Sequence, residues 1–124
     1  MNLVDSSGWL EYLTDGDNSE HFGEPLRNNH ELVVPSVVLY EVFKVVLREK
    51  DENTALQVFA SMQQGNVIDL TPELAVQAAK ISFDKKLPMP DSIILATGYQ
   101  YDAVIWTQDS NFKHLSGVKF FAKN

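Results

Sequence analysis

The chain has 124 residues, 44% of them hydrophobic and 22% charged, with a net charge of −7 and no cysteine. This size and composition predict a single globular domain over residues 1–124 and exclude the disordered and fibrous classes. The missing cysteines exclude disulfides, thiolate zinc sites and cysteine nucleophiles, and the negative charge excludes coating of nucleic acid through bulk electrostatics. Without a signal-like start or a long apolar run, we expect a cytoplasmic protein that does not contact membranes.

The first half of the chain begins with a β-branched run at residues 2–5, which predicts a strand. Trp9, Tyr12 and Leu13 follow with the spacing of an apolar helix face, which favours the core over a groove for a partner. Residues 14–29 show no clear pattern. A second strand is expected at 32–35 and a helix at Ser36–Glu49, with Ser36 as the N-cap and a core face made by Leu39, Val42, Phe43 and Val46.

In the second half, a helix is expected within Glu52–Met62 and a strand at 67–70. Thr71, Pro72 and Glu73 have the features of a helix start, and Leu74, Ala78 and Ile81 share one side of that helix. A helix over 91–101 follows two prolines, and strands are expected at 103–107, with a buried Trp106, and more weakly at 118–121. Strands that alternate with helices in this way predict an α/β fold with a parallel sheet.

Four acidic residues lie where ligands bind in such folds, beyond the carboxyl ends of the strands. Asp5 closes the first strand, Asp109 follows the fourth, Asp91 begins a helix, and Glu41 is within the helix after the second strand. Four converging carboxylates repel one another unless a cation neutralises them, and all-oxygen ligands favour Mg²⁺ or Mn²⁺. The histidines have no ligand spacing, which argues against zinc.

Each acid also has a purely structural explanation. Asp5 and Asp91 both precede serine and can be helix N-caps. Asp109 can form an Asx-turn, and Glu41 shares a helix stripe with Lys44, to which it can pair at the surface. The joint pattern of four acids, more than any one of them, favours a functional site.

Four segments, LVDSSGWL, LYEVFKVV, MPDSIILATG and WTQDSNF, resemble in order the acidic motifs of PIN-domain proteins. The short length is similar to that of the VapC toxins of bacterial and archaeal toxin–antitoxin pairs. The resemblance covers essentially the whole chain, and its most specific part runs from Asp91 to Thr97. It implies a PIN-like three-layer sandwich with a central parallel sheet of about five strands flanked by helices.

The resemblance makes Asp5, Glu41, Asp91 and Asp109 the catalytic, metal-binding carboxylates. Asn111 stands where the family often has another acid, which implies an outer or water-mediated ligand there, and Pro90 replaces a frequent alanine. The implied reaction is Mg²⁺- or Mn²⁺-dependent hydrolysis of RNA phosphodiesters by a metal-bound water. The remaining candidates are Ser6 and Thr107 for holding the carboxylates, unless they only form turns, and Lys44 and Arg48 for substrate phosphates, unless they are surface ion pairs.

The toxin analogy further implies a homodimer inhibited by a cognate antitoxin. The alternative function is a catalytically inactive PIN-like module that binds protein or RNA. Other classes fit less well. A haloacid-dehalogenase-type phosphatase needs a second Asp where Ser7 stands, a receiver domain needs paired acids and a late lysine, and the glycine motifs of nucleotide-binding proteins are missing.

Overall fold

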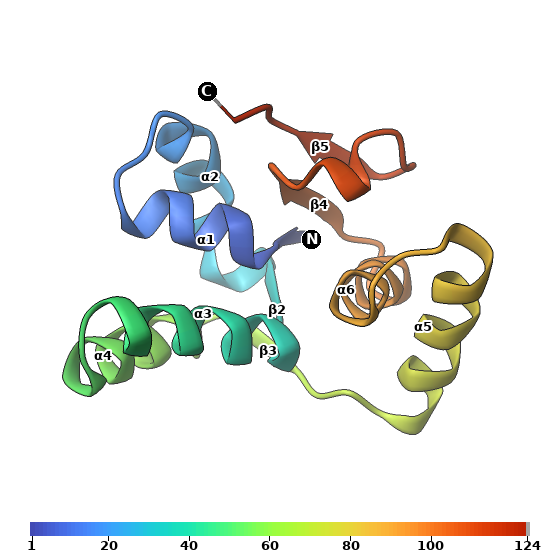
Figure 1. The fold of residues 1–124 in the computed structure, drawn as a ribbon, viewed down its shortest axis with the longest axis horizontal. Coiled ribbons are helices and arrows are strands. Elements are labelled where there is room, and N and C mark those ends of the chain that lie inside the picture. Colours follow the sequence, from blue (N-terminus) through green and yellow to red (C-terminus); the bar gives the residue numbers. More distant parts are fainter. Residues whose placement is uncertain (124) are drawn as a thin grey trace.

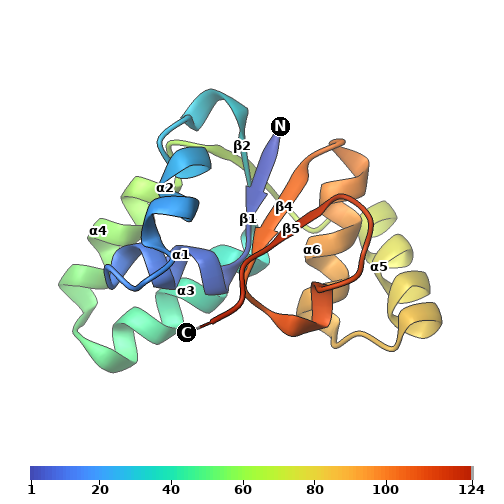
Figure 2. The same cartoon turned by 90° about the horizontal axis from the view of Figure 1, so that it is seen from above.

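The computed structural model describes residues 1–123 and contains one five-stranded parallel sheet with helices on both faces (Figures 1 and 2). The strand order is β3-β2-β1-β4-β5. The strands are β1 (Asn2–Val4), β2 (Leu32–Pro35), β3 (Asn66–Ile68), β4 (Val104–Thr107) and β5 (Val118–Phe120). The helices are α1 (Ser6–Leu13), α2 (Ser19–Leu26), α3 (Ser36–Glu49), α4 (Glu52–Met62), α5 (Pro72–Lys85) and α6 (Met89–Gln100), with short 3-10 turns η1 (Asn29–Glu31) and η2 (Ser110–Phe112).

From β1 the chain adds β2 and then β3 on one side of the sheet, and it then returns to add β4 on the other side of β1. Helices α1 to α4 cover one face of the sheet, and α5 and α6 cover the other (Figure 2). This reversal leaves a crevice beyond the carboxyl ends of β1 and β4, the usual position of a ligand in an open parallel sheet. The backbone N–H of Asp5 donates to the carbonyl of Trp106 at 3.2 Å, so pairing continues to the edge where both strands end.

The core consists of apolar side chains from both faces of the sheet. All four residues of β2 are buried, which explains why its sequence reads as an apolar run and not as an alternation. Helix α6 is buried from Ser92 to Gly98 because it lies between the sheet and α5. No helix among residues 1–123 is long and apolar enough to cross a membrane.

The structure confirms the predicted fold class and most of the predicted elements. Helices Ser36–Glu49 and Glu52–Met62 have the expected bounds, and Thr71 caps α5 by accepting from the Leu74 N–H at 3.2 Å. The N-cap predicted at Ser36 is wrong, because Pro35 occupies that position and no side chain caps the helix. The strand expected at 67–70 is Asn66–Ile68.

Prolines account for two differences between the predicted and the observed helices. Helix α6 begins at Met89, two residues before the expected start, because Pro88 is its N-cap and a proline fits in the first turn. Asp91 therefore lies inside the first turn, and its interpretation as an N-cap is wrong. Helix α2 was not predicted because Pro25 lies within it, where proline removes a backbone donor and breaks the expected pattern.

Gly8 allows α1 to pack closely on β1 and α2. A Cβ at this position would lie 2.6 Å from Val4 Cγ1 and 2.7 Å from Phe22 Cδ1, both in the buried core. We expect Gly8→Ala to lower the free energy of unfolding by about 1–3 kcal/mol, because overpacking displaces neighbours that have no room to move. Urea denaturation followed by circular dichroism measures the change.

Gly23→Ala is the matched control, since Gly23 is also a buried helical glycine. Its Cβ would meet chiefly the end of the flexible Arg27 side chain, at 2.4 Å. We expect this variant to be near neutral, because the arginine can move and alanine favours the helix. Equal destabilisation by the two variants would contradict the packing argument.

Candidate active site

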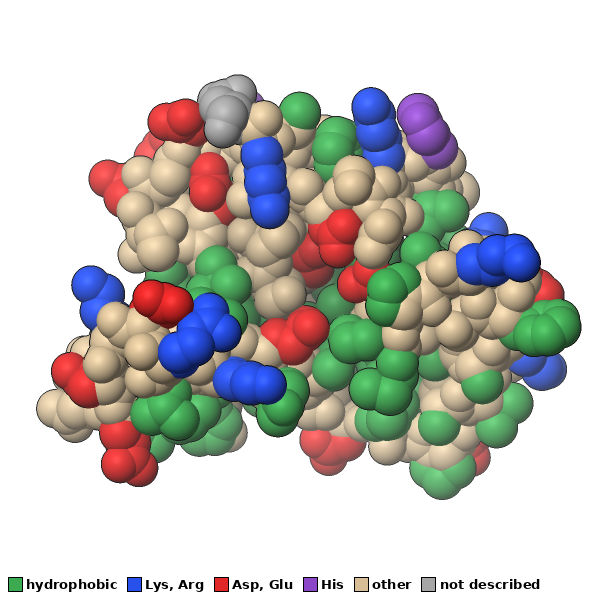
Figure 3. Space-filling view, viewed as in Figure 1, with side chains coloured by type: hydrophobic (Ala, Val, Ile, Leu, Met, Phe, Trp, Pro, Cys, Tyr) green, Lys and Arg blue, Asp and Glu red, His purple; other side chains and the backbone are tan. Residues whose placement is uncertain are grey.

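The four predicted acidic residues lie at the carboxyl-terminal edge of the sheet, although they come from separate segments. Asp5 follows β1, Asp109 lies two residues beyond β4, Glu41 is in α3, and Asp91 is in the first turn of α6. Figure 3 shows acidic side chains near the centre of this face, with lysine and arginine side chains around them. Glu41 is close enough to the other three for their charges to raise its pKa.

Asp5 is the most buried of the four, with an exposed fraction of 2%. Its Oδ1 accepts from the Ser7 hydroxyl at 2.7 Å and from the Gly8 N–H at 3.0 Å, and its Oδ2 accepts from the Thr107 hydroxyl at 2.5 Å. Burial raises the pKa of Asp5 to about 6, although these hydrogen bonds favour the charged form. Asp5 is thus both the N-cap of α1 and a carboxylate fixed at the site.

Glu41 has a carboxylate oxygen, Oε1, that is buried and has no hydrogen-bond partner among the described residues. Burial raises the pKa of Glu41, the charges of Asp91, Asp5 and Asp109 raise it further, and the Ser6 side chain opposes the rise. The surface pairing with Lys44 is wrong, because the Lys44 ammonium lies over the Tyr40 ring, 5.7 Å from its centroid. A buried oxygen without a partner is costly, which indicates a position suited to a cation.

Asn111 connects the two remaining acids. Its amide nitrogen donates to Asp91 Oδ2 at 2.8 Å, and its backbone N–H donates to Asp109 Oδ1 at 2.9 Å, which confirms the predicted Asx-turn. Burial raises the pKa of Asp91, with the Asn111 amide opposing and the Asp109 charge adding to the rise. Asn111 therefore holds a partly buried carboxylate of α6 against the loop that follows β4.

The four acids supply the carboxylate oxygens that a hard divalent cation prefers, but their side chains do not lie in positions that coordinate one. Within residues 1–123, no three His, Cys, Asp or Glu side chains are placed so that they can hold a metal ion. The oxygen donors, the raised pKa values and the unpartnered Glu41 oxygen all fit such an ion. Binding would require these side chains to move closer together than they lie here.

Thr107, one of the supporting candidates, contacts the site directly. Its hydroxyl donates to Asp5 and accepts from the Asp109 N–H at 2.9 Å, so it links the ends of β1 and β4. Sequence reasoning missed Ser7, whose hydroxyl donates to Asp5 and accepts from the Gln108 N–H at 3.1 Å. Its position two residues after a helix-capping Asp was the available signal, since a side chain there can turn back to the cap.

The other residues predicted to have structural roles lie as follows. Trp9 is buried in the core, Tyr12 packs against it and Leu13 is exposed, so most of that predicted face belongs to the core. Trp106 is buried, as expected. His21 stacks on Phe121 with ring centroids 4.5 Å apart, which is a packing contact.

Comparison with known proteins identifies the family and the fold. The family model of the PIN domain matches residues 3–118, whereas no curated protein sequence matches the chain. Among solved structures, a toxin–antitoxin complex from Klebsiella pneumoniae is similar at a TM-score of 0.81 and 19% identity, with all of both chains covered.

Two further structures are similar over most of their length. The toxin VapC20 of Mycobacterium tuberculosis, which cleaves the sarcin–ricin loop, gives a TM-score of 0.75 at 14% identity, covering 94% of this chain and 95% of that one. A DNA-bound VapBC complex from Salmonella typhimurium gives 0.74 at 15% identity, with 98% of each chain covered. The chain therefore belongs to the PIN-domain family, and it has the fold of the VapC toxins.

Proposed function

We propose that this protein is a Mg²⁺- or Mn²⁺-dependent endoribonuclease and the toxin of a toxin–antitoxin pair. The observation that carries the proposal is the convergence of Asp5, Glu41, Asp91 and Asp109, from four segments of the chain, on one edge of the sheet. Membership of the PIN-domain family and the likeness to VapC toxins support the nuclease class. A bound divalent cation would supply an activated water and stabilise charge on the phosphate.

The chain's own residues would bind and orient the reactants. Asp5 would be the most rigid metal ligand, because Thr107 and Ser7 fix its two oxygens. Asn111 would orient Asp91, and Ser6 would position Glu41, so each hydroxyl or amide acts by holding a carboxylate. No side chain of the site needs to act as a nucleophile.

The proposed partners are an RNA substrate, a second copy of the chain and an antitoxin. Complexes between toxin and antitoxin among the similar structures support the antitoxin. An open apolar groove of about 530 Å³ between α3 and α4, lined by Leu39, Phe43, Leu47, Leu56 and Phe59 among others, offers a surface on which a protein partner can bury apolar side chains. Lys44 lies at this groove, and Arg48 pairs with Glu49 at 3.0 Å.

The first prediction concerns cleavage of bacterial RNA by the purified protein. Wild type should cleave RNA in the presence of Mg²⁺ or Mn²⁺, and cleavage should stop when the metal is chelated. Asp91→Asn should cleave at least about 100-fold more slowly, because it removes a metal ligand. Gel analysis of the RNA fragments over time measures the rates.

Asp84→Asn, an exposed position on α5, is the matched control and should retain wild-type activity. The toxin role also requires that induction of wild type, but not of Asp91→Asn, halts bacterial growth. Equal cleavage by wild type and Asp91→Asn, or none with any metal, would contradict the nuclease and leave the PIN-like binding module.

A second prediction follows from the buried Asp5 carboxyl, whose pKa of about 6 lies above the ordinary value of 3.8. Because the folded state holds the Asp5 proton more tightly than the unfolded state does, wild type loses stability as the pH rises through about 6. Asp5→Asn has no such proton to lose. In metal-free protein, the stability of Asp5→Asn relative to wild type should therefore increase by about 2 kcal/mol between pH 4.5 and pH 7.5.

Urea denaturation of both proteins at the two pH values measures this change. At pH 7.5, Mg²⁺ should stabilise wild type more than Asp5→Asn, because the ion binds the folded carboxylates. A stability difference that stays constant with pH would show that Asp5 is not held in this buried environment.

A further inference from the structure

The last segment of the chain has a charge opposite to that of the whole protein. Residues 113–124 contain Lys113, Lys119 and Lys123 and no Asp or Glu, in a chain whose net charge is −7. Lys119 lies over the Trp106 ring, 4.3 Å from its centroid. Lys113, whose ammonium lies over the Phe120 ring, and Lys123 line a cavity that Asp109 also lines.

This cavity, of about 480 Å³, lies between η2, β5 and the residues that follow β5. Ser7 and Asp109 line it, and both belong to the candidate active site. Phe120 forms an apolar part of its wall, and Lys113 Nζ lies 5.9 Å from the centre of that ring. The cavity therefore combines two lysines and one aromatic ring with Asp109, one of the four site carboxylates, in its wall.

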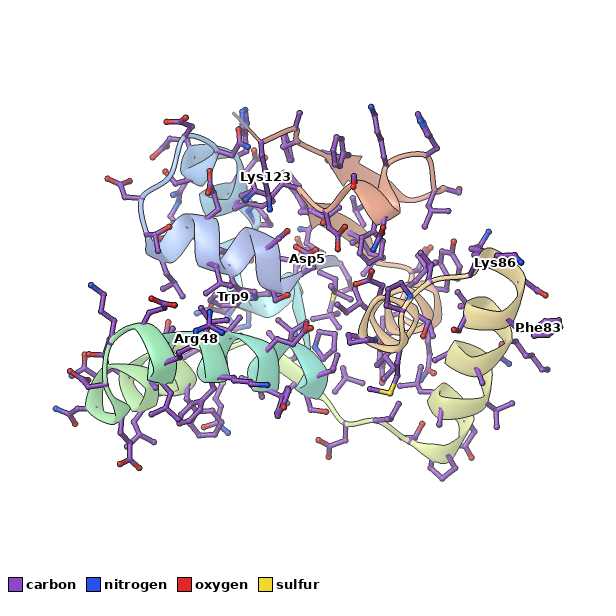
Figure 4. All side chains as sticks on the ribbon, in the orientation of Figure 1. Asp5, Trp9, Arg48, Phe83, Lys86 and Lys123 are labelled. Carbon is purple, nitrogen blue, oxygen red and sulfur yellow. The ribbon has the colours of Figure 1, made fainter. Side chains whose placement is uncertain are left out.

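The segment that carries Lys123 is fixed in place by polar and aromatic contacts. The side-chain amide of Asn18, which is buried, donates to Gln108 Oε1 at 2.9 Å and to the Ala122 carbonyl at 3.0 Å. The N–H of Phe121 donates to the Thr107 carbonyl at 2.9 Å. Figure 4 shows Lys123 on the same face as Asp5, with Arg48 on the other side of α1.

We propose that this cavity is a subsite for one nucleotide of single-stranded RNA next to the bond that is cut. Its volume suits a ligand of nucleotide size, and Lys113 and Lys123 would contact backbone phosphates. Lys113 would turn from the Phe120 ring to a phosphate, which would leave that ring to stack on a base. The inference rests on the proposed nuclease function and deepens it. It places the cationic contacts on Lys113, directly after η2, and on Lys123 in the segment after β5, in addition to those predicted for α3.

The position of the two lysines would allow an acidic protein to bind a polyanion. Substrate phosphates must approach the carboxylates, whose charge repels them until a cation is bound. Lys113 and Lys123, which line the same cavity as Asp109, would offset this repulsion locally while the net charge of the chain stays negative. A single strand suits the cavity because its unstacked bases can reach an aromatic side chain.

The test is binding of a fluorescein-labelled single-stranded RNA of mixed sequence, measured by anisotropy at several salt concentrations with Mg²⁺ present. Asp91→Asn serves as the parent so that binding is separated from cleavage. Lys113→Gln together with Lys123→Gln should weaken binding by about tenfold and reduce the slope of log Kd against log salt concentration by about 0.7 for each phosphate that the protein no longer neutralises.

Phe120→Leu should also weaken binding by about tenfold, with an unchanged salt slope, because stacking releases no counterions. Lys80→Gln, an exposed lysine of α5 on the other face of the sheet, should match the parent. Thermal melting of each variant shows that it is folded, and Phe120→Tyr, which keeps an aromatic ring, should restore binding if the leucine variant loses it.

Unchanged affinity and salt slope in the double lysine variant would overturn the subsite while the nuclease proposal stands, provided that wild type cleaves RNA. Absence of RNA binding by the parent, together with absence of cleavage by wild type, would overturn both proposals. Loss of affinity in Lys80→Gln equal to that in the double variant would also overturn the subsite, since it would show diffuse attraction.

Discussion

The buried Asp5 carboxyl and its hydrogen bond from Thr107 join the ends of β1 and β4, and the rest of the site is arranged around this junction. Asp5 caps α1 through the Gly8 N–H, so the same side chain fixes the helix, the strand end and the loop that carries Asp109. Burying a carboxyl costs free energy, as its raised pKa shows. A hydrophobic residue at this position could neither cap α1 nor accept the hydrogen bond from Thr107, so the structural role of Asp5 depends on its carboxylate oxygens.

Repulsion among the carboxylates is the second constraint on this edge of the sheet. Glu41 is affected by the charges of all three other acids and leaves one buried oxygen without a partner, while Asp91 is steadied by Asn111. A divalent cation would remove both costs at once by neutralising the charges and by coordinating the free oxygen. The surrounding hydroxyl and amide donors orient the acids without adding positive charge, so they do not offset the repulsion among the carboxylates.

Much of the fold and the four acids could be predicted because both depend on local rules. Apolar runs such as residues 32–35 mark buried parallel strands, and Asp5 and Asp109, which follow such strands, meet at one edge whatever their separation in sequence. Glu41 and Asp91 lie inside helices α3 and α6, and the resemblance to the PIN-domain motifs supported their inclusion. Helix α2 could not be predicted because Pro25 breaks its pattern, and tertiary packing decides that it forms. Ser7 was missed although it lies only two residues after Asp5, because its second bond, from the Gln108 N–H, comes from a distant part of the chain. The cavity that Lys123 lines is likewise formed by segments far apart in sequence.

We propose that Asp5, Glu41, Asp91 and Asp109 together hold a divalent cation. Anomalous diffraction from crystals soaked in Mn²⁺ tests it most directly, because manganese scatters anomalously and can take the place of Mg²⁺. We expect one or two peaks within about 2.5 Å of oxygens from at least three of these carboxylates, with Glu41 and Asp91 turned toward the ion. Crystals with no peak at this edge, or with manganese bound only elsewhere, would contradict it.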